Sequence, residues 1–322
     1  MRAAQLSRCL EGVHCAMKQD LLTILDLGKD LVEEILDLAA DMKTHRGAPA
    51  HRSILGGKSI ATIYEKPSTR TKLSFAVGIH ELGANAIELT GSGSQLSRGE
   101  TYADTGRVLE RYVHGVVFRA LKHEAVCELA AACGVPVINA LSDQHHPCQI
   151  LGDLMTVQEH FGDLHGAEIA FVGNGSNIVH SLMCGVAVLG LKLRVATPPS
   201  ANPLGSVKEM VAPVARASGA TIEYGVDPVA TVTGADVVYT DVWFDMGKDH
   251  EREARLHEYQ TYQLNSALLA HAKPTAVVMH CLPAMRGEEI TDEVMDGPQS
   301  IVFAQAENRL HIQKAIMAKL LV

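Results

Sequence analysis

The run Ser68-Thr69-Arg70-Thr71 is the first segment of this sequence whose side chains could do chemistry. It follows Pro67 and precedes the run 72–82, whose apolar positions can lie on a buried helix: Leu73, Phe75, Val77, Ile79 and Leu82. Free backbone N–H groups at a helix start attract anions, hydroxyls add donors, and an arginine can hold two oxygens of a phosphate. The segment therefore predicts an anion site, with an ordinary helix cap as the alternative. The lysine of a nucleotide P-loop is absent from it, which disfavours a nucleoside triphosphate.

The second candidate is His145-His146-Pro147-Cys148-Gln149. Its three possible metal ligands make a zinc site one interpretation, and a purely structural histidine is another. Because a residue before proline is kept out of helical geometry, His146 is expected to point away from the following helix and into a binding site. There a neutral imidazole could donate a hydrogen bond to a substrate carbonyl, and the Gln149 amide could donate another.

The second half of the chain carries an acidic segment and a thiol. Asp241 and Asp245 lie four residues apart around the only tryptophan, Trp243, and could form a pocket for an ammonium group. A surface loop with a packed aromatic ring is the alternative. His280 and Cys281 end another predicted strand, and because neighbours on a strand point apart, a Cys–His nucleophile pair is disfavoured.

The run Gly173-Asn174-Gly175-Ser176-Asn177 begins like a dinucleotide-binding fingerprint. The third glycine is missing, and the next predicted strand ends without the acid that would hold a ribose, so NAD binding is disfavoured. The glycines still allow a close backbone approach at a helix start, where Asn177 could hydrogen-bond a carboxylate.

Alternating helical and strand-like patterns position these segments. Short β-rich runs are expected at 59–64, 85–89, 115–118 and 136–141, and again at 168–172, 191–196, 221–224, 236–240, 276–279 and 300–303. Helix-length segments separate them, including 72–82, 149–161, 204–218 and 306–320. This order predicts an α/β fold with two doubly wound parallel-sheet domains. We expect the domains at 1–150 and 151–305, with a helix in 306–322 packing back on the first domain and 1–17 as a possible extension.

Ligands of open parallel sheets bind beyond the carboxyl ends of the strands. The candidate segments all follow predicted strands, and Arg119 follows the run 115–118 in the same way. We therefore expect one active site in the cleft between the two domains.

Composition narrows the class of protein. The chain has 322 residues and a formal net charge of −9, which disfavours nucleic acid as a partner. Its longest nearly uninterrupted apolar stretch, residues 182–191, is too short for a membrane helix. Seven cysteines without paired spacing favour a reducing compartment, so we expect a cytoplasmic protein. Arg2 and Arg8, with no acid before Glu11, leave a targeting segment and an extension ahead of Met17 as open interpretations.

Taken together, these motifs resemble those of the aspartate/ornithine carbamoyltransferase family, from about residue 20 to the C-terminus. Two signatures are shared by both branches of that family: Ser68-Thr69-Arg70-Thr71 and His146-Pro147-x-Gln149. Others match the ornithine branch or the C-terminal signature of the family: Asp241-x-Trp243 with Met246-Gly247, His280-Cys281-Leu282-Pro283, and Gln305-Ala306-Glu307-Asn308-Arg309.

The resemblance implies an enzyme that moves the carbamoyl group of carbamoyl phosphate to the side-chain amine of L-ornithine, giving L-citrulline and phosphate without a metal or cofactor. Carbamoyl phosphate would bind to the first domain and ornithine to the second. The implied catalytic residues are Arg70, Thr71, Arg119, His146 and Cys281. The wider carbamoyl-phosphate site would add Ser68, Thr69, Gln95, Gln149, Leu282 and Arg309. The ornithine site would comprise Asn177, Asp241, Asp245 and Met246. A homotrimer is also implied, in which Gln95 reaches the phosphate bound to an adjacent subunit.

One position departs from the family pattern. Asp245 stands where the family usually has a serine that helps to hold the α-ammonium of ornithine. A carboxylate can accept the same hydrogen bond, but it places negative charge near the substrate carboxylate. A diamine such as putrescine is therefore an alternative substrate, and a non-catalytic small-molecule-binding protein is an alternative class. The sequence leaves open whether the reaction serves arginine biosynthesis or degradation.

Overall fold

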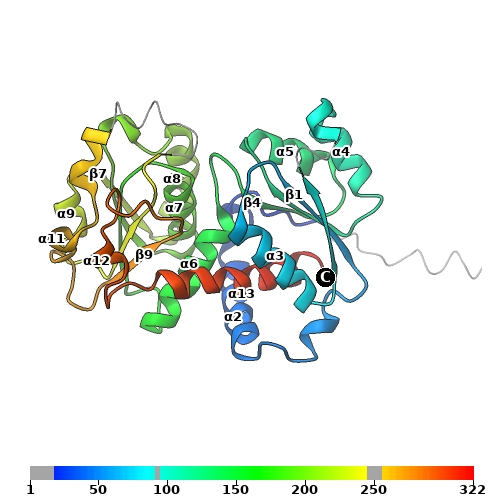
Figure 1. Cartoon of the computed structure of the whole chain (residues 1–322), viewed down its shortest axis with the longest axis horizontal. Coiled ribbons are helices and arrows are strands. Elements are labelled where there is room, and N and C mark those ends of the chain that lie inside the picture. Colours follow the sequence, from blue (N-terminus) through cyan, green and yellow to red (C-terminus); the bar gives the residue numbers. More distant parts are fainter. Residues whose placement is uncertain (1–17, 91–94, 245–255) are drawn as a thin grey trace, which may run out of the picture.

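The chain forms two parallel β-sheets that lie side by side, each with its own helices (Figure 1). The computed structural model describes residues 18–90, 95–244 and 256–322. None of the helices in these ranges is long and apolar enough to cross a membrane. The two-domain, parallel-sheet prediction is confirmed.

The first domain holds a four-stranded sheet in the order β2-β1-β3-β4. Its strands are β1 (Ser59–Tyr64), β2 (Asn85–Thr90), β3 (Gly115–Arg119) and β4 (Val137–Leu141). The connecting helices are α3 (Thr69–Glu81), α4 (Tyr102–Leu109) and α5 (His123–Ala132), and α2 (Gly28–Thr44) precedes the sheet. The strand order reverses between β1 and β3, so the loops after these two strands flank the place where ligands of such sheets bind.

The second domain holds a five-stranded sheet in the order β7-β6-β5-β8-β9. Its strands are β5 (Glu168–Val172), β6 (Lys192–Ala196), β7 (Thr221–Gly225), β8 (Val237–Thr240) and β9 (Val277–His280). Its helices include α7 (Asn177–Leu189), α8 (Gly205–Ser218), α9 (Pro228–Val232), α11 (Ser266–Leu269) and α12 (Asp292–Met295). Here the reversal falls between β5 and β8, whose following loops carry Asn174 and Asp241. The central strands are buried along nearly their whole length, as expected for a parallel sheet covered on both faces.

Two long helices connect the domains (Figure 1). α6 (Pro147–Phe161) follows β4 and packs against α7 of the second domain. Pro147 at its first turn has a φ suited to a helix start, and Gly162 ends the helix with a φ of 79°. α13 (Val302–Leu320) starts beside β9 and then packs against α6, α2 and α3.

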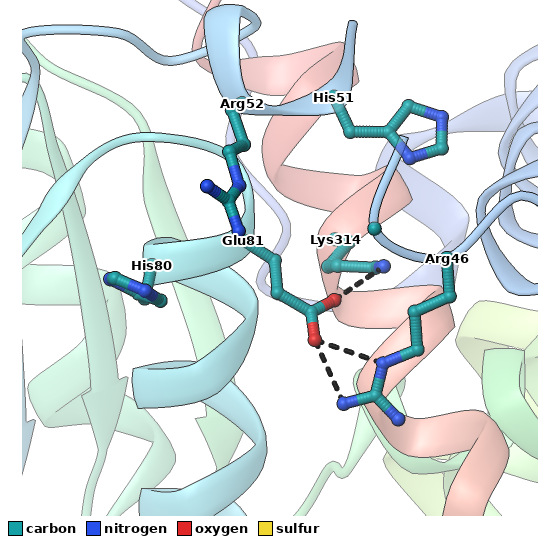
Figure 2. A pocket seen from close by; sticks show the side chains of 7 residues that line it. Arg46, His51, Arg52, His80, Glu81 and Lys314 are labelled. Carbon is teal, nitrogen blue, oxygen red and sulfur yellow. Dashed lines mark hydrogen bonds and ion pairs between the residues drawn. The ribbon is translucent and has the colours of Figure 1, made fainter. Parts of the chain in front are cut away.

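Lys314 of α13 is buried among elements of the first domain. Its Nζ donates to Glu81 Oε2 at 2.8 Å, while Arg46 donates from Nε and Nη2 to Glu81 Oε1 at 2.9 and 2.8 Å. Figure 2 shows Lys314 and Arg46 approaching Glu81 from two sides, in a pocket of about 370 Å³ that His51, Arg52 and His80 also line. The ion pair joins the end of α3 to α13.

Two details of the expected elements are wrong. Residues 300–303 are not a strand: Ser300 forms a single β-bridge with Val278, and α13 begins at Val302. The β-branched run is short, and the helix-favouring residues after it extend the helix back into it. The apolar positions of α3, all expected on a buried helix, also divide between two faces. Leu73 and Val77 are 60% and 38% exposed, whereas Phe75, Ile79 and Leu82 are buried, because positions 73 and 77 lie on the opposite side of the helix.

Candidate active site

The start of α3 is built as a capped helix N-terminus. Ser68 adopts an extended backbone, and its hydroxyl accepts a hydrogen bond from the Thr71 backbone N–H at 3.2 Å. This cap fixes the first turn, in which Thr69 is exposed, Arg70 is half-buried and Thr71 is buried. The helix cap and the anion site are therefore compatible, since the other N–H groups of the first turn point outward from the helix end.

Arg309 joins three elements at the junction of the domains. From α13 it donates to Thr71 Oγ1 of α3 at 3.0 Å and to Gln149 Oε1 of α6 at 2.9 Å. All three side chains are buried, and Arg309 is only 4% exposed. A helix from the C-terminus of the chain thus supplies a guanidinium to the end of the first sheet.

Three arginines gather at this place: Arg70, Arg119 and Arg309. Burial, followed by the charges of Arg309 and Arg70, lowers the pKa of Arg119 to about 10. Within the described ranges none of the three forms an ion pair with a carboxylate. The Nε atoms of Arg119 and Arg309 are buried without a hydrogen-bond partner. The group is therefore a concentration of positive charge with unused donors, which suits an anion.

His146 lies beside these arginines at the start of α6. Its backbone N–H donates to Ser181 Oγ of α7 at 2.7 Å, and its φ of −136° is outside the helical range, as a position before proline requires. Burial, followed by the charges of Arg309 and Arg119, holds the pKa of this ring well below its usual value. The imidazole is therefore neutral near pH 7, and its Nδ1 has no partner among the described residues.

Asp241 and Cys281 face each other at the ends of β8 and β9. The Cys281 thiol donates to Asp241 Oδ1 at 3.1 Å. Burial raises the pKa of Cys281 well above its usual value, and the Asp241 charge raises it further. Burial also raises the pKa of Asp241, although His280 and the thiol hydrogen bond oppose that shift. Cys281 is thus a protonated thiol, which is a donor rather than a thiolate nucleophile.

Asp241, Cys281 and His280 are the one set of three possible metal ligands found in the described part of the chain. All three are already engaged within the protein. His280 Nδ1 accepts from the Leu282 N–H at 2.9 Å, and its Nε2 lies 3.1 Å from Glu289 Oε1. The zinc interpretation of His145, His146 and Cys148 fails on Cys148, whose thiol is buried in the core and donates to the Asn139 carbonyl at 3.5 Å.

The remaining candidates are placed as follows. Asn177 of α7 donates to the Ser142 carbonyl at 2.7 Å, which ties the second domain to the loop after β4. Leu282 follows Cys281 with a φ of 60°. Gln95 opens the exposed short helix Gln95–Arg98. Asp245 and Met246 lie outside the described residues.

Two buried polar residues at this junction, Asp153 and Tyr239, lie outside the motifs and were not expected from the sequence, and Gln305 of the C-terminal signature was not expected to contact them. Asp153 of α6 accepts from Gln149 Nε2 at 2.8 Å, and Gln305 of α13 donates to it at the same distance. Tyr239 of β8 donates to its other oxygen at 2.7 Å. One signal was available: Asp153 is four residues after Gln149, and so on the same helix face, within a run that is otherwise mostly apolar.

Comparisons with known proteins agree with this arrangement. Residues 19–159 match the family model "Aspartate/ornithine carbamoyltransferase, carbamoyl-P binding domain", and residues 165–320 match the corresponding "Asp/Orn binding domain". The ornithine carbamoyltransferase of Methanoculleus marisnigri is 49% identical over 305 residues, covering 95% of this chain and 97% of that protein. The one of Methanothermobacter thermautotrophicus is also 49% identical, over 92% of this chain and 97% of its own.

Solved structures give the same result. The ornithine carbamoyltransferase from Pyrococcus furiosus superposes with a TM-score of 0.89 at 46% identity, covering 94% of this chain and 97% of that one. The anabolic enzyme from Campylobacter jejuni superposes with a TM-score of 0.88 at 35% identity, covering 94% and 98%. Both halves of the chain thus match one family: the chain belongs to the aspartate/ornithine carbamoyltransferase family.

Proposed function

We propose that this protein transfers the carbamoyl group of carbamoyl phosphate to the δ-amine of L-ornithine, forming L-citrulline and phosphate. The observation that carries the proposal is a group of three arginines that form no ion pair with any carboxylate in the described part of the chain, beside a neutral His146 and opposite Asp241. Its relatives named ornithine carbamoyltransferase, at close to half identity over nearly the whole chain, favour ornithine as the amine.

On the carbamoyl-phosphate side, Ser68, Thr69 and Arg70 would hold the phosphate at the start of α3. Arg119, Thr71 and His146 would donate to the carbonyl oxygen. Gln149 and Leu282 would complete the carbamoyl pocket, and Arg309 would hold Thr71 and Gln149 in place. As the amine attacks, negative charge grows on the carbonyl oxygen, where each preorganised donor can contribute on the order of 3 kcal/mol.

On the amine side, Asp241 would accept a hydrogen bond from the ornithine amine, and Cys281 would help to orient that carboxylate. Asn177, Asp245 and Met246 would contact the rest of the amino acid. An alkylamine with a pKa of about 10 must lose a proton before it attacks. The new C–N bond forms, the C–O bond to phosphate breaks, and the departing phosphate takes the proton of the former amine. Holding both substrates in reactive geometry supplies much of the remaining acceleration.

The experiment is a colorimetric assay for ureido products with ornithine, putrescine and aspartate as acceptors. We expect citrulline from ornithine and no comparable product from the other two. A preference for putrescine would show that Asp245 has changed the amine, and no product from any acceptor would favour a binding protein. Asp245→Ser should alter the KM for the amine more than the KM for carbamoyl phosphate.

Arg70→Ala should abolish turnover, because Arg70 would bind the phosphate. The protein should stay folded, because Arg70 is half-buried and is not part of the hydrophobic core. Circular dichroism would verify the fold. Arg216→Ala, which changes an exposed arginine of α8, is the matched control and should keep full activity. Near-normal turnover by Arg70→Ala would remove the phosphate assignment.

We also propose that the protein acts as a homotrimer in which Gln95 of one subunit reaches the phosphate in the next. Two features support this. Leu73 and Val77 of α3 and Ile87 of the edge strand β2 are exposed on the first domain, where a neighbouring subunit could cover them. Gln95 is exposed on its short helix, so its amide is accessible to another chain.

A cytoplasmic location is the last part of the proposal. Cys133, Cys148 and Cys184 are buried free thiols, and Cys127 and Cys281 are partly buried free thiols. Proteins with several unpaired cysteines suit a reducing compartment.

A further inference from the structure

A chain of hydrogen bonds between buried side chains crosses from the first domain to the second. It starts at Thr71 and passes through Arg309 and Gln149 to Asp153, with distances of 3.0, 2.9 and 2.8 Å. Asp153 lies on α6 and is 2% exposed. The site already described therefore continues into a polar interior that no substrate can touch directly.

Beyond Asp153 the hydrogen bonds continue to the amine side of the proposed site. Gln305 donates from Nε2 to Asp153 Oδ1 at 2.8 Å and to the Tyr239 hydroxyl at 3.2 Å. The Gln305 carbonyl oxygen accepts from the His280 backbone N–H at 2.9 Å. His280 immediately precedes Cys281, whose thiol bonds Asp241. One carboxylate is thus linked, through two amides, to both halves of the proposed site.

The three groups that bond Asp153 are all neutral donors: the Gln149 amide, the Gln305 amide and the Tyr239 hydroxyl, which donates to Oδ2 at 2.7 Å. An ionised carboxylate accepts from all of them, whereas a protonated acid would turn its own O–H toward a donor. Because each amide gives its N–H to Asp153, each must turn its oxygen the other way. Gln149 therefore offers oxygen to Arg309, and Gln305 offers oxygen to His280.

An apolar side chain could fill this space without the free-energy cost of removing a carboxylate from water. Packing alone therefore does not explain Asp153. Burial raises the pKa of Asp153 to about 6, against the lowering effect of its three hydrogen bonds and of Arg309. We propose that Asp153 is a positioning residue of the carbamoyl transfer, which orients Gln149 and Arg309 on the carbamoyl-phosphate side and the His280 backbone on the amine side. This inference rests on the proposed function.

The test compares Asp153→Asn with Thr156→Val. Both changes disturb a buried polar contact between α6 and α13, since Thr156 accepts from Asn308 at 3.0 Å. Thr156 itself donates to the Gly152 carbonyl and does not bond the series of side chains that leads to Arg309. The Asp153→Asn change would turn an amide N–H toward donors. We expect it to lower kcat/KM for carbamoyl phosphate at least about tenfold and to weaken carbamoyl-phosphate binding in calorimetry at least about fivefold. Thr156→Val should lower the melting temperature and leave both quantities within about twofold of wild type.

A folded Asp153→Asn enzyme whose kcat/KM and affinity match those of Thr156→Val would overturn the proposal. If Asp153→Asn does not fold, Tyr239→Phe decides, because it removes one of the three donors and keeps the ring. It should lower kcat/KM about threefold, and an unchanged value overturns the proposal.

The binding measurement separates this inference from the proposed function. If wild type binds carbamoyl phosphate but forms no citrulline, the proposed function fails, and the affinities of the two variants still decide the role of Asp153. If wild type neither binds nor turns over carbamoyl phosphate, both proposals fail.

Discussion

At the scale of single residues, the Asp241–Cys281 pair shows how a buried acid can stay available to an amine. The carboxylate is 5% exposed, and the Cys281 thiol donates to one of its oxygens at 3.1 Å. The carboxylate also accepts from the Val242 backbone N–H, and with about four acceptor positions on its two oxygens it can still face a substrate ammonium or amine. Since burial raises the pKa of Asp241, a bound cation would bring it back toward its ordinary value.

Asp241→Asn should raise the KM for ornithine about tenfold or more and leave the affinity for carbamoyl phosphate within about twofold, because an amide cannot balance the charge of the amine. Steady-state kinetics with each substrate varied in turn would measure both. Cys281→Ser keeps a donor toward Asp241 and serves as the control, with a smaller change expected. An equal rise in both KM values would place Asp241 outside the amine pocket.

Residues in motifs could be found from the sequence, and their partners could not. Arg70, His146 and Asp241 stand out because polar types follow predicted strands at the edge where ligands bind. Tyr239 looks like an ordinary strand residue, and the signature that contains Gln305 does not say what its side chain contacts. Only the packing of α13 beside β8 and β9 makes both of them neighbours of Asp153. Contacts between residues far apart along the chain leave no local pattern in the sequence.

At the scale of elements, the ion pair between Lys314 and Glu81 holds α13 against the end of α3 (Figure 2). The two partners are unequal, because the Lys314 side chain is 1% exposed and that of Glu81 is 20% exposed. The hydrogen bonds from Lys314 and Arg46 outweigh the burial of Glu81, so the pKa of this carboxyl is lowered. The buried ammonium of Lys314 therefore depends on Glu81 to balance its charge, more than Glu81 depends on Lys314.

Glu81→Ala should therefore destabilise the protein by about 3 kcal/mol, because it leaves a buried ammonium without its carboxylate. Lys314→Met should cost less, about 1 kcal/mol, since Glu81 keeps Arg46 and contact with water. Urea denaturation would measure both. Glu34→Ala is the control: it breaks the exposed pair of Glu34 with Lys319, on the same helix as Lys314, and should change stability by less than about 1 kcal/mol. The reverse order for Glu81 and Lys314 would contradict the argument.

The elements themselves could largely be predicted, since nine of the expected β-rich runs coincide with β1 to β9 within two residues at each end. Alternating apolar runs and helical spacing carry that information locally. The tenth run, at 300–303, is not a strand, so the local pattern alone was not enough to predict it. A short β-rich segment becomes a strand only if a neighbour pairs with it, and here the pairing stops at the bridge between Ser300 and Val278.

At the scale of the whole molecule, histidines lie where the two domains meet. The His145 ring lies 4.8 Å from that of His123 and 6.2 Å from that of His180. His180 belongs to α7; its Nδ1 bonds the Gln144 carbonyl at 3.0 Å and its Nε2 accepts from the Leu204 N–H at 3.0 Å, which requires the neutral ring. Burial lowers the pKa of all three histidines, that of His145 to about 3.

Folding should therefore lose stability as the pH falls below about 6.5, because the unfolded chain then binds protons that the folded chain does not. For His145 this loss should continue down to about pH 3, the value of its folded pKa. Asp153 acts in the opposite direction between its folded pKa of about 6 and its unfolded value of 3.8, since the folded state then holds the extra proton. Burial also raises the pKa of Asp26 and Asp241, which act as Asp153 does. The five histidines with a lowered pKa outnumber these three carboxyls, so the net change should be a loss.

Thermal melts at about pH 7.5 and about pH 5.5 would measure the effect. His145→Gln should reduce the loss of unfolding free energy between them by about 1.4 kcal/mol, the value of one pH unit below the unfolded pKa. His271→Gln changes an exposed histidine in the second domain and should leave the loss as in wild type. A pH response that is the same in His145→Gln and wild type would show that this ring is not the source.

The proposed trimer predicts that two inactive variants regain activity when their subunits assemble together. If Arg70 and Gln95 act in the same site from adjacent chains, Arg70→Ala and Gln95→Ala should each be nearly inactive. In a cyclic trimer that contains both variants, one junction pairs an intact Arg70 with an intact Gln95 from the next subunit. Random mixing at equal amounts puts about three quarters of the trimers in this class, so refolding the two proteins together should restore about a quarter of wild-type activity. Mixing after separate refolding is the control and should restore none while the trimers stay intact. If co-refolded samples also stay inactive, although size-exclusion chromatography shows mixed trimers, Gln95 does not complete the site of a neighbour.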